Sequence, residues 1–155
     1  MFEKLKRKVN RVFIHCSASD VPAHDNVATI REWHLARGFS DVGYHFFIRK
    51  DGTVEEGRSL KKTPAGQKGN NTKTIAICLH GLLKDKFTEE QFSSLRDLCG
   101  DIDDELDVTF HGHCEVSVKS CPVFDYKEVL RLDEEGNILR ELTREEQFKA
   151  DLLLF

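Results

Sequence analysis

Stretches of apolar residues recur along this chain at the lengths expected for strands. Residues 9–15 alternate loosely between polar and apolar side chains and carry the run Val-Phe-Ile at 12–14, which predicts a buried strand. Residues 75–79, Ile-Ala-Ile-Cys-Leu, are short, apolar and β-branched at two positions, so they predict a central strand. Residues 108–110 predict a further strand, which ends just before two histidines.

Helices are predicted between these strands, because capping residues precede segments with helical spacing of apolar side chains. Asp25 or Asn26 is placed to cap a helix that Gly38 closes. Thr88–Gln91 is a capping box that opens a second helix, and Thr143–Glu146 is another that opens a last one. The apolar faces of the first two helices are predicted to contain Val27, Ile30, Trp33, Phe92, Leu95, Leu98 and Ile102, with His34 as a further candidate on the first helix.

One hairpin interrupts this alternation. Asp51-Gly52, the strongest short hairpin signal in the chain, lies between the extended segments 44–50 and 53–56. Strands that alternate with helices, together with one hairpin, predict an α/β fold with a central mixed β-sheet flanked by helices. The length of 155 residues suits one domain covering residues 1–155.

Charge and hydropathy narrow the possible partners. The formal net charge is −4, from 23 basic and 27 acidic side chains, which argues against strong nonspecific electrostatic attraction to nucleic acid. No stretch approaches the roughly 20 apolar residues that span a bilayer, so no membrane association is expected. The basic residues 1–10 have no apolar segment of signal-peptide length behind them, which predicts synthesis in a cytosol.

The five cysteines are too few and too scattered for a disulfide framework. An odd number excludes complete pairing, so free thiols or a metal ligand are expected. Cys78 and Cys99 fall on a predicted strand and a predicted helix and are interpreted as small buried hydrophobes. Cys16 and Cys114 each follow a histidine, and we expect them to lie near one another in the reduced state.

Three candidate metal ligands occur where predicted strands end. His15 ends the first strand, His113 follows a later one, and Cys121 lies eight residues further on. Imidazole and thiolate are good zinc donors, and three protein ligands with one open position are typical of a catalytic site. Taken alone, a histidine at a strand or a buried cysteine more often packs in the structure than binds a metal. The concentration of histidine, cysteine and glutamate within residues 111–121 favours the metal hypothesis.

Two other chemistries use the same residues. His113-Cys114-Glu115 has the H-x-E form of a zinc deaminase, but the P-C-x-x-C partner motif is missing. Cys121 is also a possible nucleophile served by a histidine, although no orienting motif stands out. Neither alternative explains His15, so both remain minor hypotheses.

Four segments carry a resemblance to a known family. They are VFIHCSAS (12–19), GYHFFIRKDGTVEEGR (43–58), NNTKTIAICLHG (70–81) and FHGHCEVSVKSCPVFD (110–125). With these segments in order over residues 9–128, the chain resembles the zinc-dependent N-acetylmuramoyl-L-alanine amidases of the amidase-2 type. It is most similar to the small single-domain phage endolysins, relatives of the peptidoglycan recognition proteins. Residues 129–155 form a C-terminal extension that we expect to be helical.

The resemblance implies a role for five residues. His15, His113 and Cys121 fall on the three Zn²⁺ ligands of the family, while Tyr44 and Lys119 fall on its catalytic positions. The implied reaction is hydrolysis of the peptidoglycan amide between the lactyl group of N-acetylmuramic acid and L-alanine. Tyr44 would hold or relay the proton of the attacking water, and Lys119 would stabilise the oxyanion.

Several positions are expected to modify this picture. Gln67 stands where relatives often have a histidine, and Cys114 follows the second ligand. Both are expected to lie on the path of the glycan or the stem peptide, so they bear on substrate preference. Arg58 and Lys68 are candidate contacts for the anionic stem peptide. Asp125 matches a recurrent acid and is a candidate partner for a ligand side chain.

The expected function is therefore that of a phage or prophage endolysin or of a bacterial wall amidase. An endolysin would accumulate in the host cytoplasm and be released to the cell wall, and we expect a monomer. The alternative is a non-catalytic peptidoglycan-binding module that uses the same groove. A regulatory partner of another phage protein is a third hypothesis that no motif supports.

Overall fold

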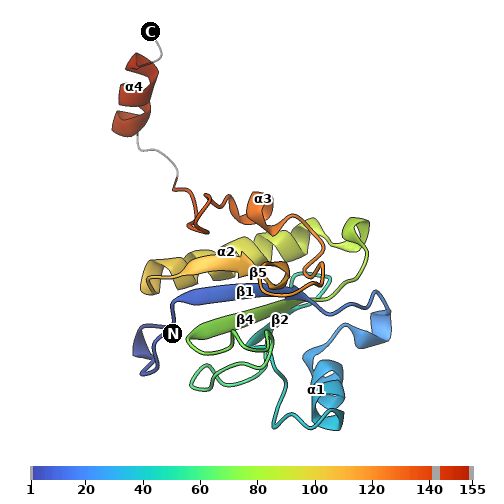
Figure 1. Ribbon diagram of the computed structural model, residues 1–155. Coiled ribbons are helices and arrows are strands. Elements are labelled where there is room, and N and C mark those ends of the chain that lie inside the picture. The colour runs from blue at the N-terminus through green and yellow to red at the C-terminus, as the bar shows by residue number, and fades with distance from the viewer. Residues whose placement is uncertain (1, 141–143, 154–155) are drawn as a thin grey trace.

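The chain folds into three layers, with a β-sheet between helices (Figure 1). The computed structural model describes residues 2–140 and 144–153. The strands are β1 (Arg11–Cys16), β2 (Phe46–Ile48), β3 (Val54–Glu56), β4 (Thr74–Leu79) and β5 (Thr109–Gly112). The α-helices are α1 (Val27–Ala36), α2 (Glu89–Glu105), α3 (Tyr126–Leu130) and α4 (Arg144–Leu152). Short 3₁₀ helices are η1 (Phe2–Lys4), η2 (Pro22–His24), η3 (Lys84–Lys86) and η4 (His113–Glu115).

The sheet is mixed, as predicted, and its strand order is β3-β2-β4-β1-β5. β1 runs parallel to both β4 and β5, and β2 runs parallel to β4. Only β2 and β3 are antiparallel, because the predicted hairpin joins them. The carboxyl ends of β1, β4 and β5 therefore meet at one edge, which is where parallel sheets commonly carry their functional groups.

The hairpin forms at Asp51-Gly52, but its two strands are shorter than the predicted segments. Arg49 donates its backbone N–H to the carbonyl of Thr53, and Gly52 donates to Arg49, so the turn takes up residues at both strand ends. Gly52 has a φ of +90°, and a Cβ there would lie 2.8 Å from the carbonyl oxygen of Glu90 in α2. Glycine is thus required both for the turn and for close helix packing.

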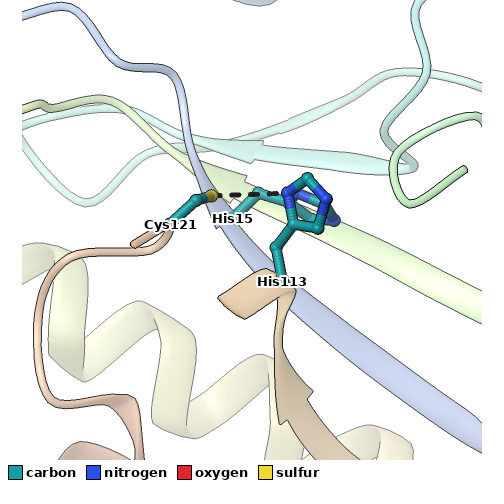
Figure 2. Close-up of side chains that lie close together, drawn as sticks. All are labelled: His15, His113 and Cys121. Carbon is teal, nitrogen blue, oxygen red and sulfur yellow. Dashed lines mark hydrogen bonds between the residues drawn. The ribbon is translucent and has the colours of Figure 1, made fainter. Parts of the chain in front are cut away.

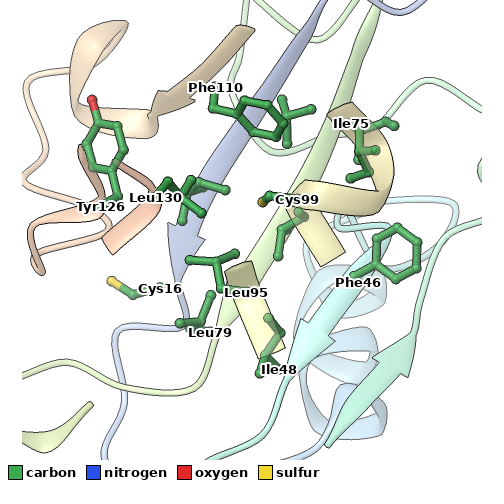
Figure 3. Packing of buried hydrophobic residues seen from close by; sticks show 14 of the residues in the cluster. Cys16, Phe46, Ile48, Ile75, Leu79, Leu95, Cys99, Phe110, Tyr126 and Leu130 are labelled. Atoms are coloured by element: carbon green, nitrogen blue, oxygen red, sulfur yellow. The ribbon is translucent and has the colours of Figure 1, made fainter. Parts of the chain in front are cut away.

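The main hydrophobic core lies between the sheet and the helices α2 and α3 (Figure 3). The predicted capping box of α2 is present, with Thr88 and Gln91 each accepting a backbone N–H from the other. Helical spacing then turns one face of α2 onto the sheet. The core residues labelled in Figure 3 include Ile48, Ile75, Leu79, Leu95, Cys99 and Phe110.

A smaller cluster covers the opposite face of the sheet, where α1 packs. Its buried members are Ile30, Val42, Phe47 and Cys78. Asn26, rather than Asp25, caps α1 through its side-chain oxygen, which accepts the N–H of Thr29. On the predicted apolar face of α1, Ile30 and the further candidate His34 are buried, whereas Trp33 is 37% exposed.

Leu95 offers a direct test of the main core. Its side chain on α2 has no exposed surface, so Leu95→Ala removes apolar contacts and leaves a cavity. We expect a loss of about 2–5 kcal/mol in the free energy of unfolding, measured by denaturant titration. The same substitution at Leu35, which is 48% exposed on α1, is the matched control and should change stability by less than about 0.5 kcal/mol.

The segment after β5 returns to the edge of the sheet. Phe110 in β5 donates its backbone N–H to the carbonyl of Gly136 at 2.8 Å, and Leu132 forms an isolated bridge with Ile138. α4 follows, and the predicted capping box Thr143–Glu146 falls partly outside the described residues. None of the described helices combines the length and apolar character needed to cross a bilayer.

Candidate metal centre and groove

The three predicted metal ligands converge at the carboxyl edge of the sheet (Figure 2). The donor atoms of His15, His113 and Cys121 all lie within 4.8 Å of one another. The Cys121 sulfur is 3.9 Å from Nδ1 of His15, and the two imidazole rings are 4.6 Å apart between centroids. No other described residues form such a group of histidine, cysteine or carboxylate side chains.

Strand register explains why two of these residues meet. Ile14 of β1 is opposite Gly112 of β5, so the next residues along the two parallel strands lie side by side: His15, still within β1, and His113, directly after β5. The loop after η4 then returns to the metal centre, where the backbone N–H of Cys114 donates to the carbonyl of Cys121 at 2.7 Å.

A hydrogen-bond cluster anchors η4, the element that carries His113. Glu115 accepts the backbone N–H of Gly112 at 2.9 Å and the hydroxyl of Tyr126 at 2.6 Å. The other oxygen of Glu115 lies 3.1 Å from Nδ1 of His111. Burial raises the pKa of Glu115, but these hydrogen bonds outweigh it and hold that pKa below its usual value. His111 therefore has a structural role in this cluster.

The spacing of the His15 and Cys121 donors is close to that around a tetrahedral zinc ion. Zn–N bonds of about 2.0–2.1 Å and Zn–S bonds of about 2.3 Å place donor atoms roughly 3.3–3.6 Å apart. The 3.9 Å between His15 Nδ1 and Cys121 Sγ is close to that value. The backbone N–H of Cys16 also points at the Cys121 sulfur, 3.1 Å away, which is the donor that a metal-bound thiolate requires.

The protonation states of the donors are also suitable. Burial, followed by the proximity of His113, lowers the pKa of His15 to about 3. Burial, followed by Lys119, also lowers the pKa of His113. Both imidazoles are therefore neutral at pH 7 and have a lone pair to donate. A hydrogen bond with Cys16 and burial raise the pKa of the Cys121 thiol, so a bound cation would be needed to hold it as thiolate.

A groove of about 810 Å³ opens over these ligands, a size that suits a small ligand or a peptide segment. His113 and Cys121 line it together with Tyr44 and Lys119, so the structure brings the predicted catalytic residues to the same place as the ligands. The other lining residues include Trp33, His34, Arg37, Phe39, Lys68 and Asn71.

Tyr44 lies against His15, with ring centroids 5.0 Å apart. Burial, followed by the nearby Cys78, raises the pKa of Tyr44 well above its usual value, so the phenol is a hydrogen-bond donor at neutral pH. Lys119 is exposed and forms no ion pair with the residues that the structure describes. Its charge lowers the pKa of both His15 and His113.

Other predicted site residues have different roles. Arg58 donates to the backbone carbonyls of Val42 and Thr63, so its guanidinium holds loops together. Asp125 caps α3 by accepting the N–H of Glu128 and is no partner of a ligand side chain. Lys68 does line the groove.

Two expectations about substrate-facing residues were wrong. Gln67 is fully buried and does not line the groove, because its side chain points to His15. Cys114 is exposed and is not among the groove-lining residues. The backbone N–H groups of Cys114 and Cys16 both donate to Cys121, so these two cysteines flank the same residue. Arg37 was missed as a groove residue, since an exposed arginine at a helix end carries no sequence signal of its own.

Comparisons with known proteins agree with this geometry. The model of a family described as N-acetylmuramoyl-L-alanine amidase matches residues 5–124. An endolysin of Escherichia phage T7 is 39% identical over 131 residues, which cover 80% of this chain and 87% of the endolysin. The solved structure of the N-acetylmuramoyl-L-alanine amidase LysC from Clostridium intestinale is 28% identical, with a TM-score of 0.74 over 81% of this chain and 85% of LysC.

The fold extends to proteins of lower identity. Drosophila peptidoglycan recognition protein SD is 22% identical and superposes with a TM-score of 0.69, covering 86% of this chain and 88% of that protein. At this identity the likeness concerns the fold alone. Together the comparisons confirm the predicted fold and the predicted resemblance.

Proposed function

Because the chain belongs to the N-acetylmuramoyl-L-alanine amidase family, we propose that His15, His113 and Cys121 hold a zinc ion for cleavage of the peptidoglycan amide. The chain is a peptidoglycan amidase of the phage endolysin type. The bond cleaved joins the lactyl group of N-acetylmuramic acid to L-alanine. The single observation that carries the proposal is the convergence of two neutral imidazoles and one thiol beside the groove.

The residues around the donors suit amide hydrolysis. Zinc, when bound, lowers the pKa of a coordinated water to near 7 and polarises a carbonyl. The phenol of Tyr44 lies beside His15 and stays protonated at neutral pH, so it would orient the attacking water through a hydrogen bond. The ammonium of Lys119 is placed to stabilise the negative charge that develops on the carbonyl oxygen.

Cleavage of purified peptidoglycan tests this function directly. We expect new L-alanine amino termini and free lactyl groups in equal amounts when the zinc-loaded protein is added. Removal of the metal by a chelator should stop cleavage, and added Zn²⁺ should restore it, because the ligands stay in place around the centre.

Three outcomes would contradict the proposal. Full cleavage after verified removal of zinc would exclude a metal-dependent reaction. Binding of peptidoglycan without cleavage by the zinc-loaded protein would favour the alternative, a binding module that uses the same groove. An amino terminus other than L-alanine would assign the activity to a different bond.

We also propose that the chain accumulates in the host cytoplasm, is released to the cell wall and acts as a monomer. The likeness to a phage endolysin supports the route. Fractionation of infected or expressing cells before and after lysis, together with light scattering of the purified protein, tests these points. Export before lysis would contradict the proposed route, and a dimeric mass would contradict the monomer.

A further inference from the structure

A buried glutamine contacts the ligand His15 on the side away from the metal centre. Oε1 of Gln67 lies 2.8 Å from Nε2 of His15, and neither side chain has more than 1% of its surface exposed. The other ring nitrogen of His15, Nδ1, is the one that faces Cys121. Gln67 therefore bonds the nitrogen that does not face the metal centre.

The direction of this hydrogen bond follows from the partners of the amide group. Nε2 of Gln67 lies 2.7 Å from the hydroxyl of Thr74 and 3.3 Å from the carbonyl of Asn70. A carbonyl only accepts, and the Thr74 hydroxyl already donates to the carbonyl of Asn71 at 2.7 Å. The amide nitrogen must face this side, so Oε1 faces His15 and accepts from it.

This chain of hydrogen bonds determines which nitrogen of His15 carries the proton. A neutral imidazole has one N–H and one lone pair. Since Nε2 must donate to Gln67, the lone pair lies on Nδ1, the atom directed at the metal centre. The opposite tautomer would set a lone pair against the oxygen of Gln67 in a buried space.

The backbone around Gln67 is shaped for this contact. Asn71 accepts the N–H groups of both Gly66 and Gln67 through its side-chain oxygen, which closes the loop beneath His15. A Cβ at Gly66 would lie 3.0 Å from Nε2 of His15 and 3.4 Å from the ring of Tyr44. Glycine at 66 thus lets the loop come close enough for the Gln67 amide to reach the imidazole.

We propose that Gln67 is a positioning residue of the metal centre, which holds His15 in the tautomer and orientation that direct Nδ1 to the metal. The proposal rests on the proposed zinc site. An amide performs this task without adding charge, whereas a carboxylate in the same place would add a negative charge to a fully buried contact. Gln67 acts through His15 and does not line the groove.

The tautomer itself can be observed in the unmodified protein. Long-range ¹H–¹⁵N spectra of metal-free protein distinguish a protonated Nε2 from a protonated Nδ1 for each histidine. We expect His15 to carry its proton on Nε2 at pH 7, in accordance with its contact to Gln67. A proton on Nδ1 would overturn the proposal, whatever the variants do.

Gln67→Met keeps the volume of the side chain and removes its hydrogen bonds. We expect about 10–100-fold weaker zinc binding, measured by competition with a chelator, because partners of ligand histidines typically contribute that much. We also expect a mixture of His15 tautomers in the metal-free variant. Unchanged affinity together with an unchanged tautomer would overturn the proposal.

Gln91→Met is the matched control for the loss of a buried glutamine. Gln91 is also fully buried. Its amide donates to the backbone carbonyls of His80 and Ile48, and neither residue is a candidate ligand. The Gln91→Met substitution should lower the stability of the fold but leave zinc affinity within about twofold and the His15 tautomer unchanged. An equal loss of affinity in both variants would indicate general destabilisation and contradict the proposal. Tight zinc binding without peptidoglycan cleavage would contradict the proposed function alone.

Discussion

Lys119→Ala is expected to lower kcat about 100- to 1000-fold while leaving the zinc content of the protein unchanged. Lys119 lines the groove, and its charge lowers the pKa of His15 and His113, so it acts at the centre where the substrate carbonyl is proposed to bind. It is not a ligand, and the metal centre should survive its removal. Turnover of purified peptidoglycan, measured beside metal analysis of the same sample, checks both halves of this expectation.

Lys68→Ala is the matched control, because Lys68 is a second lysine of the same groove. Its charge is not a cause of the pKa shift of either ligand histidine. We expect the loss of this charge to change KM rather than kcat. A similar fall of kcat in both variants would mean that the groove needs positive charge in general, and the specific role of Lys119 would then be wrong.

Cys121→Ala should remove zinc and activity together. The sulfur is one of only three protein donors at the centre, and the two remaining imidazoles do not hold a catalytic zinc site by themselves. We expect zinc affinity to fall by more than the roughly 10–100-fold that loss of a ligand's hydrogen-bond partner costs. Equilibrium dialysis against zinc, followed by the peptidoglycan assay, measures both effects.

Cys114→Ala controls for the removal of a thiol from the same loop. Cys114 is exposed, and its contribution to the loop is a backbone N–H that alanine also has. Its zinc content and turnover should match those of the unmodified protein. If Cys121→Ala retained full zinc content and activity, Cys121 would not be a ligand. Thermal unfolding curves of both variants show whether each one is folded.

The elements that the sequence predicts well are those set by neighbouring residues. The capping box at Thr88 and Gln91 and the turn at Asp51-Gly52 use contacts only a few residues apart, so the pattern of residue types is enough. The α/β class follows from the same alternation of strands and helices. Strand order is different, because it depends on which of several apolar strands pair.

The sequence singled out His15, His113 and Cys121 as candidate ligands, but it did not show how they come together. His15 and His113 are neighbours because Ile14 is opposite Gly112 in the sheet, and no residue type along the chain encodes that register. The resemblance to a family supplied what spacing did not, since it assigned both histidines to one ion. Cys121 then reaches them through the loop that follows η4.

The failures concern polar side chains whose environment is tertiary. Gln67 was expected on the substrate path, yet it is fully buried, because three polar partners satisfy the hydrogen bonds of its amide. On α1, the candidate His34 is buried because its Nδ1 accepts the N–H of Gly43 at 2.8 Å, whereas Trp33 is 37% exposed. A pattern of apolar residues cannot reveal a buried glutamine whose amide is satisfied by other parts of the fold.

The bond from Phe110 to Gly136 has a consequence for where the enzyme can be shortened. β5 is the outermost strand beside β1, and its free side would expose unpaired backbone if residue 136 were absent. The family match ends at residue 124, before Gly136 and before Tyr126, which supports η4. The region shared with the family is therefore smaller than the unit that holds His113 in place, and a truncated enzyme needs to keep the chain through residue 138.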